Sequence, residues 1–205
     1  MNKNIQAVKW YPRLFTGDMV RALLDGRKTA TRWPFRKQPV EDVSHRAGKW
    51  VWEDVAGNVF RAPVRPGDVI WARETWARVS IPNGTCAREL VTVYAADNPH
   101  GLLWPSRWKP NIHMPRRYAR IFLRVTQFSL MRVQDISEEE AQAEGVSSSV
   151  KQIVKFGRGM RITTARQKFA ALWDALYAAR GLGWGANPWV WAADFQQISM
   201  AEAEA

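Results

Sequence analysis

The 205-residue chain is poor in the residues that hold metals and form disulfides. Its one cysteine, Cys86, excludes an internal disulfide and a cysteine-rich metal site, and no basic pattern surrounds it. Its three histidines, His45, His100 and His113, are scattered without the spacing of metal ligands. We therefore expect no metal ion and no other cofactor, and we expect Cys86 to be inert.

Long hydrophobic runs are absent as well. No eighteen consecutive residues are apolar, so no segment is predicted to cross a membrane. Residues 1–5 lack the apolar core of a signal peptide. A hydrophobic content of 46% and a charged content of 24% are ordinary for a globular protein. These features predict a cytoplasmic protein without a membrane partner.

Negative charge is scarce relative to positive charge. Thirty Lys and Arg residues stand against 19 Asp and Glu residues, a formal net charge of +11. Such an excess attracts polyanions, of which nucleic acid is the commonest. Basic residues are mixed with aromatic residues in residues 33–37, 104–109 and 116–118, where rings could stack on bases and cations could hold phosphates. RNA is thus a candidate partner, and the alternative is a basic surface around a tryptophan-rich core.

A short helix is predicted over residues 17–25. Thr16 is a good N-cap, and Gly26 is a suitable stop. Lys28 and Thr31 follow, where the helix gives way to extended chain. A lysine can act as a base if burial or a neighbouring cation lowers its pKa, and a threonine hydroxyl beside it is a plausible nucleophile. Alternatively, Lys28 is a cation that stabilises the end of the helix, and Thr31 is an ordinary β-branched residue of a strand.

The remaining elements are predicted from periodicity, capping residues and turn signals. Strands are expected over residues 69–76, 91–95, 120–128 and 189–198, a hairpin around residues 57–58, and helices over residues 137–145 and 164–180. In the last helix Phe169, Leu172, Trp173 and Leu176 form one apolar stripe.

Strands outnumber helices and do not alternate with them, which predicts an α+β fold. We expect a single domain over residues 1–205, built as a mixed or antiparallel β-barrel with helices packed around it. Two segments, residues 33–66 and 96–118, are predicted to be long insertions, residues 146–162 a flexible loop, and residues 201–205 a frayed end.

Several of these segments resemble the ASCH domain family, whose fold is a PUA-like β-barrel. Residues 26–31 (Gly-Arg-Lys-Thr-Ala-Thr) resemble the signature after that family's first helix, and residues 66–69 resemble the following turn and strand. A longer form found in phages and prophages is similar over nearly the whole chain. It shares the motifs at residues 73–76, 108–115, 135–145 and 187–189.

One branch of the ASCH family consists of small N4-acetylcytidine amidohydrolases, which hydrolyse the acetamide on the cytosine amine. By motif, the resemblance implies Lys28 as proton acceptor, Thr31 as nucleophile and Glu144 as proton donor. This chain differs from that branch in its greater length and its predicted insertions.

Glu144 directly precedes Gly145, so it is expected at a helix C-terminus. The negative end of the helix dipole disfavours a carboxylate there, and a carboxyl group that keeps its proton suits donation to a leaving amine. The alternative is a further solvated carboxylate, after Glu138, Glu139 and Glu140.

Arg27, Arg32 and Arg73 are candidates to supply a positive field and to bind the substrate. Trp76 is a candidate floor for a base pocket.

Glu74 lies in the predicted strand 69–76 and needs a partner if it points inward. It could accept a hydrogen bond from a substrate amine, or pair with Arg73 or Arg120.

The leading hypothesis is a metal-free hydrolase that removes the acyl group from N4-acylated cytosine or cytidine. Attack by Thr31 and attack by a water that Lys28 activates both remain open, as does the form of the substrate, which is free base, nucleoside or RNA. The alternatives are an RNA-binding PUA-like module and a metal-independent ribonuclease that uses the same basic cleft.

Overall fold

The computed structural model describes residues 8–45, 50–82, 88–97, 105–146, 149–150 and 162–204. Cys86, His100, Trp104 and most of the predicted loop 146–162 lie outside these residues. The chain divides into two compact units. Unit 1 comprises Met1–Gly26, Asp68–Arg124 and Gln196–Ala205, and unit 2 comprises Arg27–Gly67 and Val125–Phe195.

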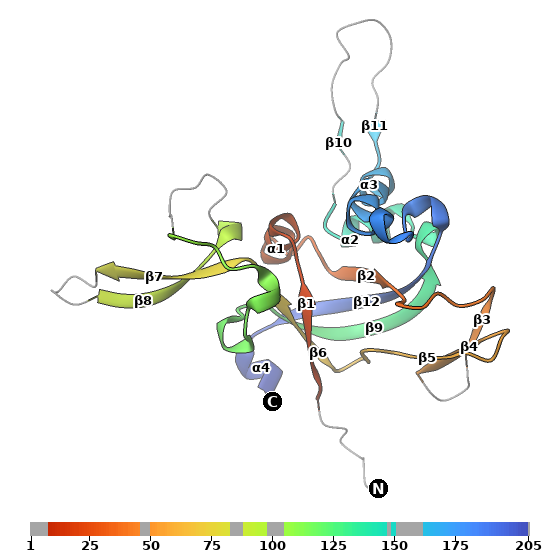
Figure 1. Ribbon diagram of the computed structural model, residues 1–205, viewed down its shortest axis with the longest axis horizontal. Helices are drawn as coiled ribbons and strands as arrows, with labels where there is room; N and C mark the ends of the chain where they lie inside the picture. Colours follow the sequence, from red (N-terminus) through yellow and green to blue (C-terminus); the bar gives the residue numbers. More distant parts are fainter. Residues whose placement is uncertain are drawn as a thin grey trace, which may run out of the picture. The chain divides into compact units, whose positions relative to one another are not determined.

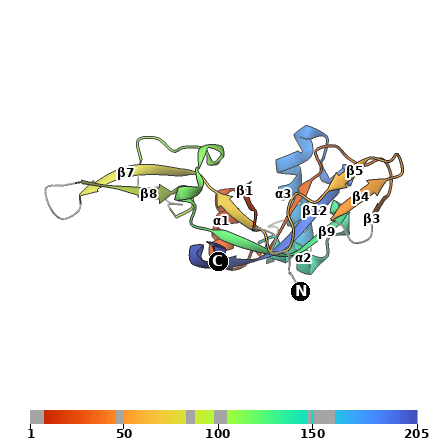
Figure 2. The same cartoon turned by 90° about the horizontal axis from the view of Figure 1, so that it is seen from below.

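Unit 1 contains a parallel strand pair, a long hairpin and short helices. In it β1 runs parallel to β6, and β6 pairs antiparallel with the first residues of β9. Figure 2 shows the β7–β8 hairpin as two long antiparallel strands. The elements are β1 (Trp10–Leu14), α1 (Gly17–Leu24), β6 (Val69–Arg73), β7 (Trp76–Pro82), β8 (Arg88–Tyr94), β9 (Phe122–Arg132, shared with unit 2), α4 (Met200–Glu204), and the 3₁₀ turns η1 (Ala95–Asp97), η2 (Asn111–His113) and η3 (Arg116–Tyr118).

The predicted helix 17–25 is confirmed as α1. The Thr16 hydroxyl accepts a hydrogen bond from the Met19 amide, and Gly26 follows in the left-handed conformation (φ +70°). The cap and the stop identified in the sequence therefore set both ends of this helix.

The predicted strand 69–76 is wrong as one element, because the chain leaves the sheet after Arg73. The Glu74 amide donates to the Met114 sulfur, and the backbone of Trp76 exchanges two hydrogen bonds with Lys109, at 2.8 and 3.2 Å. Trp76 then begins β7, which pairs with β8. Strand propensity runs on through residues 69–76, but the change of partners comes from tertiary contacts.

The predicted frayed end is also wrong for residues 201–204, which belong to α4. Ser199 and Glu202 form a capping box, and Ala203 is buried in a cluster with Val69, Trp71 and Phe122. The helix is thus held by its cap and by this cluster.

Unit 2 is a sheet with helices on one face. In it β12 lies between β9 and β2, and α2 and α3 lie side by side (Figure 1). Its elements are β2 (Ala30–Pro34), β3 (Val43–His45), β4 (Val51–Asp54), β5 (Val59–Arg61), α2 (Glu138–Ala143), β10 (Ser149–Val150), β11 (Ile162–Thr163), α3 (Ala165–Tyr177), β12 (Trp189–Ile198), and the 3₁₀ turns η4 (Val133–Asp135), η5 (Ala178–Arg180) and η6 (Trp184–Ala186).

The predicted insertion 33–66 contains a small sheet of its own, β3-β4-β5. The expected hairpin at residues 57–58 joins β4 to β5, and Asp54 accepts hydrogen bonds from the Ala56 and Asn58 amides in its turn. Aromatic rings join this sheet to the rest of unit 2. Trp52 lies 5.1 Å from the Trp191 ring, and Phe35 stacks on that ring at 4.0 Å.

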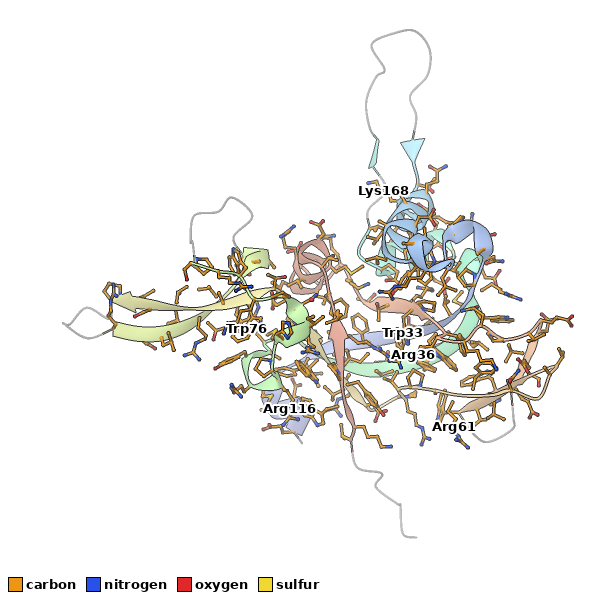
Figure 3. All side chains as sticks on the ribbon, viewed as in Figure 1. Trp33, Arg36, Arg61, Trp76, Arg116 and Lys168 are labelled. Atoms are coloured by element: carbon orange, nitrogen blue, oxygen red, sulfur yellow. The ribbon has the colours of Figure 1, made fainter. Side chains whose placement is uncertain are left out.

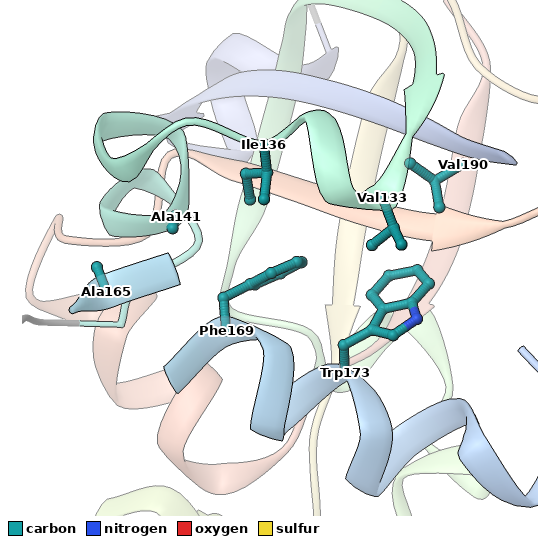
Figure 4. Packing of buried hydrophobic residues seen from close by; sticks show 7 residues of the cluster. All are labelled: Val133, Ile136, Ala141, Ala165, Phe169, Trp173 and Val190. Atoms are coloured by element: carbon teal, nitrogen blue, oxygen red, sulfur yellow. The ribbon is translucent and has the colours of Figure 1, made fainter. Parts of the chain in front are cut away.

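The other face of the unit 2 sheet carries the core shown in Figure 4. Phe169 and Trp173 from α3 pack with Val190 of β12, whereas the neighbouring Trp191 joins the aromatic cluster. Successive residues of β12 therefore pack on opposite faces of the sheet. The predicted α3 stripe is correct at Phe169 and Trp173, but Leu176 is exposed.

The protein thus has an α+β fold with mixed parallel and antiparallel pairing. Within the described strands of either unit, no closed barrel is formed. No helix of the described chain is long and apolar enough to cross a membrane.

Candidate functional site

The C-terminus of α2 is where two of the predicted site residues meet. Ser137 and Glu140 form a capping box, with Glu140 N to Ser137 Oγ at 3.1 Å and Ser137 N to Glu140 Oε2 at 2.9 Å. Glu144 is the C-cap residue, and Gly145 follows with φ +90°. The position expected for Glu144 at the end of this helix is therefore confirmed.

Lys28 and Glu144, which lie 116 residues apart in the sequence, are hydrogen-bonded in the structure. The Thr29 amide donates to the Ala143 carbonyl at 2.8 Å, which brings the start of β2 alongside the end of α2. Lys28 Nζ donates to Glu144 Oε2 at 2.6 Å, to the Glu144 carbonyl at 3.0 Å and to the Ala30 carbonyl at 2.8 Å. Its side chain is 0% exposed. These three acceptors match the three donors of an ammonium group.

Arg32 holds the second oxygen of the same carboxylate. Its Nη1 lies 3.2 Å from Glu144 Oε1, and its Nη2 lies 3.1 Å from Glu140 Oε1. The Arg32 side chain is 2% exposed and that of Glu144 4%, whereas Glu140 is 44% exposed. We call Lys28, Arg32, Glu140 and Glu144 the buried ion cluster. Its two cations balance its two carboxylates, which is what burial of charge requires.

Thr31 is not brought to this cluster. In the register of β2 with β12, Arg32 lies opposite Ala192 and Thr31 opposite Ala193. Because successive side chains of a strand point to opposite faces, Thr31 and Arg32 lie on different faces of the sheet. Thr31 is half-buried, and among the described residues its side chain makes no hydrogen bond to Lys28 or Glu144.

Arg27 lies beside the cluster. Its guanidinium is exposed and donates to the Gly145 carbonyl at 2.9 Å. It thereby binds the backbone at the end of α2, where a cation is favoured by the helix dipole.

The remaining predicted site residues belong to unit 1. The Arg120 guanidinium donates hydrogen bonds to both carboxylate oxygens of Glu74, at 2.8 and 2.9 Å, and to both of Asp97, at 2.8 and 2.7 Å. Burial raises the pKa of Glu74 above its ordinary value, and Arg120 opposes that rise. Of the two roles predicted for Glu74, the structure therefore shows the ion pair, and its partner is Arg120. Arg73 instead donates to the Met114 carbonyl at 3.1 Å.

Trp76 stands at the start of β7, where Figure 3 labels it. Its ring lies 4.7 Å from Tyr118, and Lys109 Nζ lies 4.8 Å from the ring centroid. The residue is buried, yet its indole nitrogen has no hydrogen-bond partner in the described part of the chain. The ring is thus enclosed by an aromatic and a cationic neighbour.

Sequence reasoning missed two carboxylates at the α2 site, Glu140 and Asp194. The sequence analysis names Glu140 only among the carboxylates that precede Glu144. Asp194 is the only charged residue of the strand 189–198, a signal that could have drawn attention to it. Partial burial raises the pKa of Asp194, the charges of Glu140 and Glu144 act in the same direction, and Arg32 opposes them. Within the described ranges, no three His, Cys, Asp or Glu side chains are grouped to hold a metal ion.

Comparison with known proteins identifies no family. No family model matches the chain, and no curated protein is similar to it in sequence. A crystal structure of protein EF3133 from Enterococcus faecalis V583, of the DUF984 family, is similar with a TM-score of 0.45 and 11% identity, over 95% of this chain and 84% of that one. The ASCH resemblance therefore stays a prediction.

Proposed function

We propose that this protein is an amidohydrolase of the ASCH type, with a PUA-like fold, that removes the acyl group from N4-acylated cytosine or cytidine. The observation that carries the proposal is the 2.6 Å contact between Lys28 Nζ and Glu144 Oε2. These are the two residues to which the motif resemblance gives the roles of proton acceptor and proton donor. The proposal also includes the expected cytoplasmic location.

The chemistry follows from this contact. At 2.6 Å a proton can pass between Lys28 and Glu144 along the existing hydrogen bond. With that proton on Glu144, the Lys28 amine has a lone pair that can accept a proton from a nucleophile. Arg32 at the other oxygen stabilises the carboxylate when the proton returns. The pair therefore offers a base and an acid without a metal ion.

The burial of the pair sets the direction from which a substrate would approach. The Lys28 and Glu144 side chains are buried, whereas Glu140 is partly exposed and Asp194 is exposed. An acylated amine would come from the side of these two carboxylates. Because Thr31 lies on the opposite face of the sheet, this geometry favours a water nucleophile over an acetyl-threonine intermediate.

The test is conversion of N4-acetylcytidine to cytidine, followed by chromatography. Lys28→Met removes the amine and keeps the length of the side chain, so turnover should vanish. Lys37→Met is the matched control, because Lys37 is an exposed lysine of the same unit that bonds the Asn58 side chain. Circular dichroism would show that each variant is folded. Folded wild-type protein that leaves acetylated base, nucleoside and RNA intact would refute the proposal.

Unit 1 favours RNA binding as a second candidate function. Residues 105–124 contain six Lys or Arg residues and no Asp or Glu. The guanidiniums of Arg117 and Arg78 lie 4.8 and 5.1 Å from the Tyr118 ring, and that of Arg116 lies 4.5 Å from the Trp10 ring. Cations beside aromatic faces suit phosphates and stacked bases.

RNA binding is tested by titrating a fluorescent single-stranded RNA at several salt concentrations. The logarithm of the affinity should fall linearly with that of the salt concentration. Replacing Arg116 and Arg117 together by alanine should weaken binding and reduce the slope. Arg61→Ala, on the exposed edge strand β5 of unit 2, is the control. Binding that is absent or insensitive to salt contradicts this candidate.

A further inference from the structure

Asp194 is an exposed carboxyl group beside the buried ion cluster. We propose that Asp194 donates the proton to the leaving cytosine amine, and that Glu144 acts behind it by positioning Lys28 and exchanging a proton with it. This inference rests on the proposed amidohydrolase function.

Glu144 is poorly placed to touch a leaving group. Its Oε2 accepts from Lys28, its Oε1 accepts from Arg32, and the side chain is only 4% exposed. Its backbone carbonyl accepts a further hydrogen bond from Lys28. A substrate nitrogen could reach this carboxyl group only by displacing one of the two cations, which would leave a buried charge without its partner.

The register of the sheet places Asp194 on the same face as the buried ion cluster. Asp194 lies opposite Ala30 and Ala192 lies opposite Arg32, so Asp194 and Arg32 share a face. The buried neighbours Ala193 and Phe195 anchor the strand here, and the Phe195 amide donates to the Thr29 carbonyl at 2.9 Å. The position of Asp194 is therefore held by the backbone on both sides.

The side chain of Asp194 is free to act. It is exposed, and it makes no hydrogen bond or ion pair with any residue that the structure describes. The charged groups that face it are Arg32 from β2 and Glu140 and Glu144 from α2, with Lys28 in the same cluster. Partial burial and the two glutamates raise its pKa, the direction that keeps a proton available for donation.

Lys28 first passes a proton to Glu144 along their hydrogen bond, and its neutral amine then turns from that carboxyl group toward the water. The oxygen of this water bonds to the acyl carbon, and Lys28 takes one of its protons. The bond from carbon to N4 then breaks, its electron pair stays on N4, and the Asp194 proton is transferred to that nitrogen. The products are the free amine and the carboxylic acid. The proton on Lys28 returns to Asp194 through solvent, which restores the site for another turnover.

The test compares pH–rate profiles of wild type, Asp194→Asn and the control Asp42→Asn, an exposed aspartate elsewhere in unit 2. General acid catalysis contributes about 10² to 10⁴-fold, so kcat of Asp194→Asn should fall by at least about 10²-fold with little change in KM. Its remaining activity should lose the decline at high pH, and Asp194→Glu should restore part of the rate. The variant should stay folded, because the side chain has no partner to lose.

The outcomes separate the two proposals. If wild type is active and Asp194→Asn keeps its kcat or both limbs of its profile, Asp194 is not the acid while the amidohydrolase function stands. If folded wild type does not hydrolyse the acylated amine, both proposals fall.

Discussion

Lys28→Met should destabilise the protein strongly, independently of any catalytic role. The substitution leaves the Glu144 carboxylate with Arg32 alone, and it removes the donor from the Ala30 and Glu144 carbonyls. Removing one partner of a buried ion pair costs about 3–5 kcal/mol. Because Arg32 still holds the other oxygen at 3.2 Å, we expect the lower end, about 3 kcal/mol. That is a large part of a typical unfolding free energy of about 5–15 kcal/mol.

The assay is urea unfolding followed by tryptophan fluorescence, for Lys28→Met, Glu144→Gln and the double variant. In the double variant the buried charge and its partner are lost together, so it should be more stable than the sum of the single losses predicts, by about 0.5–3 kcal/mol. Lys37→Met should lie within about 0.5 kcal/mol of wild type. A loss below about 1 kcal/mol for Lys28→Met, or strict additivity, would refute the reasoning.

Three further changes test the structure of unit 2. Phe169→Ala leaves a cavity in the core under α3 and should lower the free energy of unfolding, measured in urea, by about 3–5 kcal/mol. A small loss, as at a surface position, would contradict this. Gly145→Ala places a side chain at φ +90° and should lower the free energy of unfolding by about 1–2 kcal/mol. An unchanged free energy of unfolding would contradict this. For Glu138→Gln, backbone hydrogen bonds from Arg166 and Ala165 hold the pKa of Glu138 below its ordinary value. The unfolded chain then binds more protons at acid pH, so the stability due to Glu138 is present above its ordinary pKa and is lost as the pH falls. The gap in melting temperature between wild type and Glu138→Gln should therefore be widest near neutral pH and close in acid; a gap that is constant with pH would contradict this.

Local chemistry explains why some elements could be predicted. The caps at Thr16, Ser137 and Thr164 satisfy backbone amides within four residues, so they act before any tertiary contact forms. The strand 189–198 was predicted with the bounds it has in the structure, because its apolar run is bounded by turn residues. The break of the strand after Arg73 could not be predicted, since distant segments supply the partners of Glu74 and Trp76.

By itself the sequence determined the ends of α1, the bounds of β12 and the α+β class, and its resemblance to a family pointed to Lys28, Thr31 and Glu144. Only the tertiary structure decided how these residues are arranged. The end of α2 meets the start of β2, which closes the ion pair between Lys28 and Glu144 and leaves Thr31 on the other face. The physical reason is that burial of charge must be satisfied by whichever partners the folded chain brings within a few ångströms, and no local pattern encodes that distance. Asp194 becomes a candidate acid for the same reason, through the register of β12 with β2.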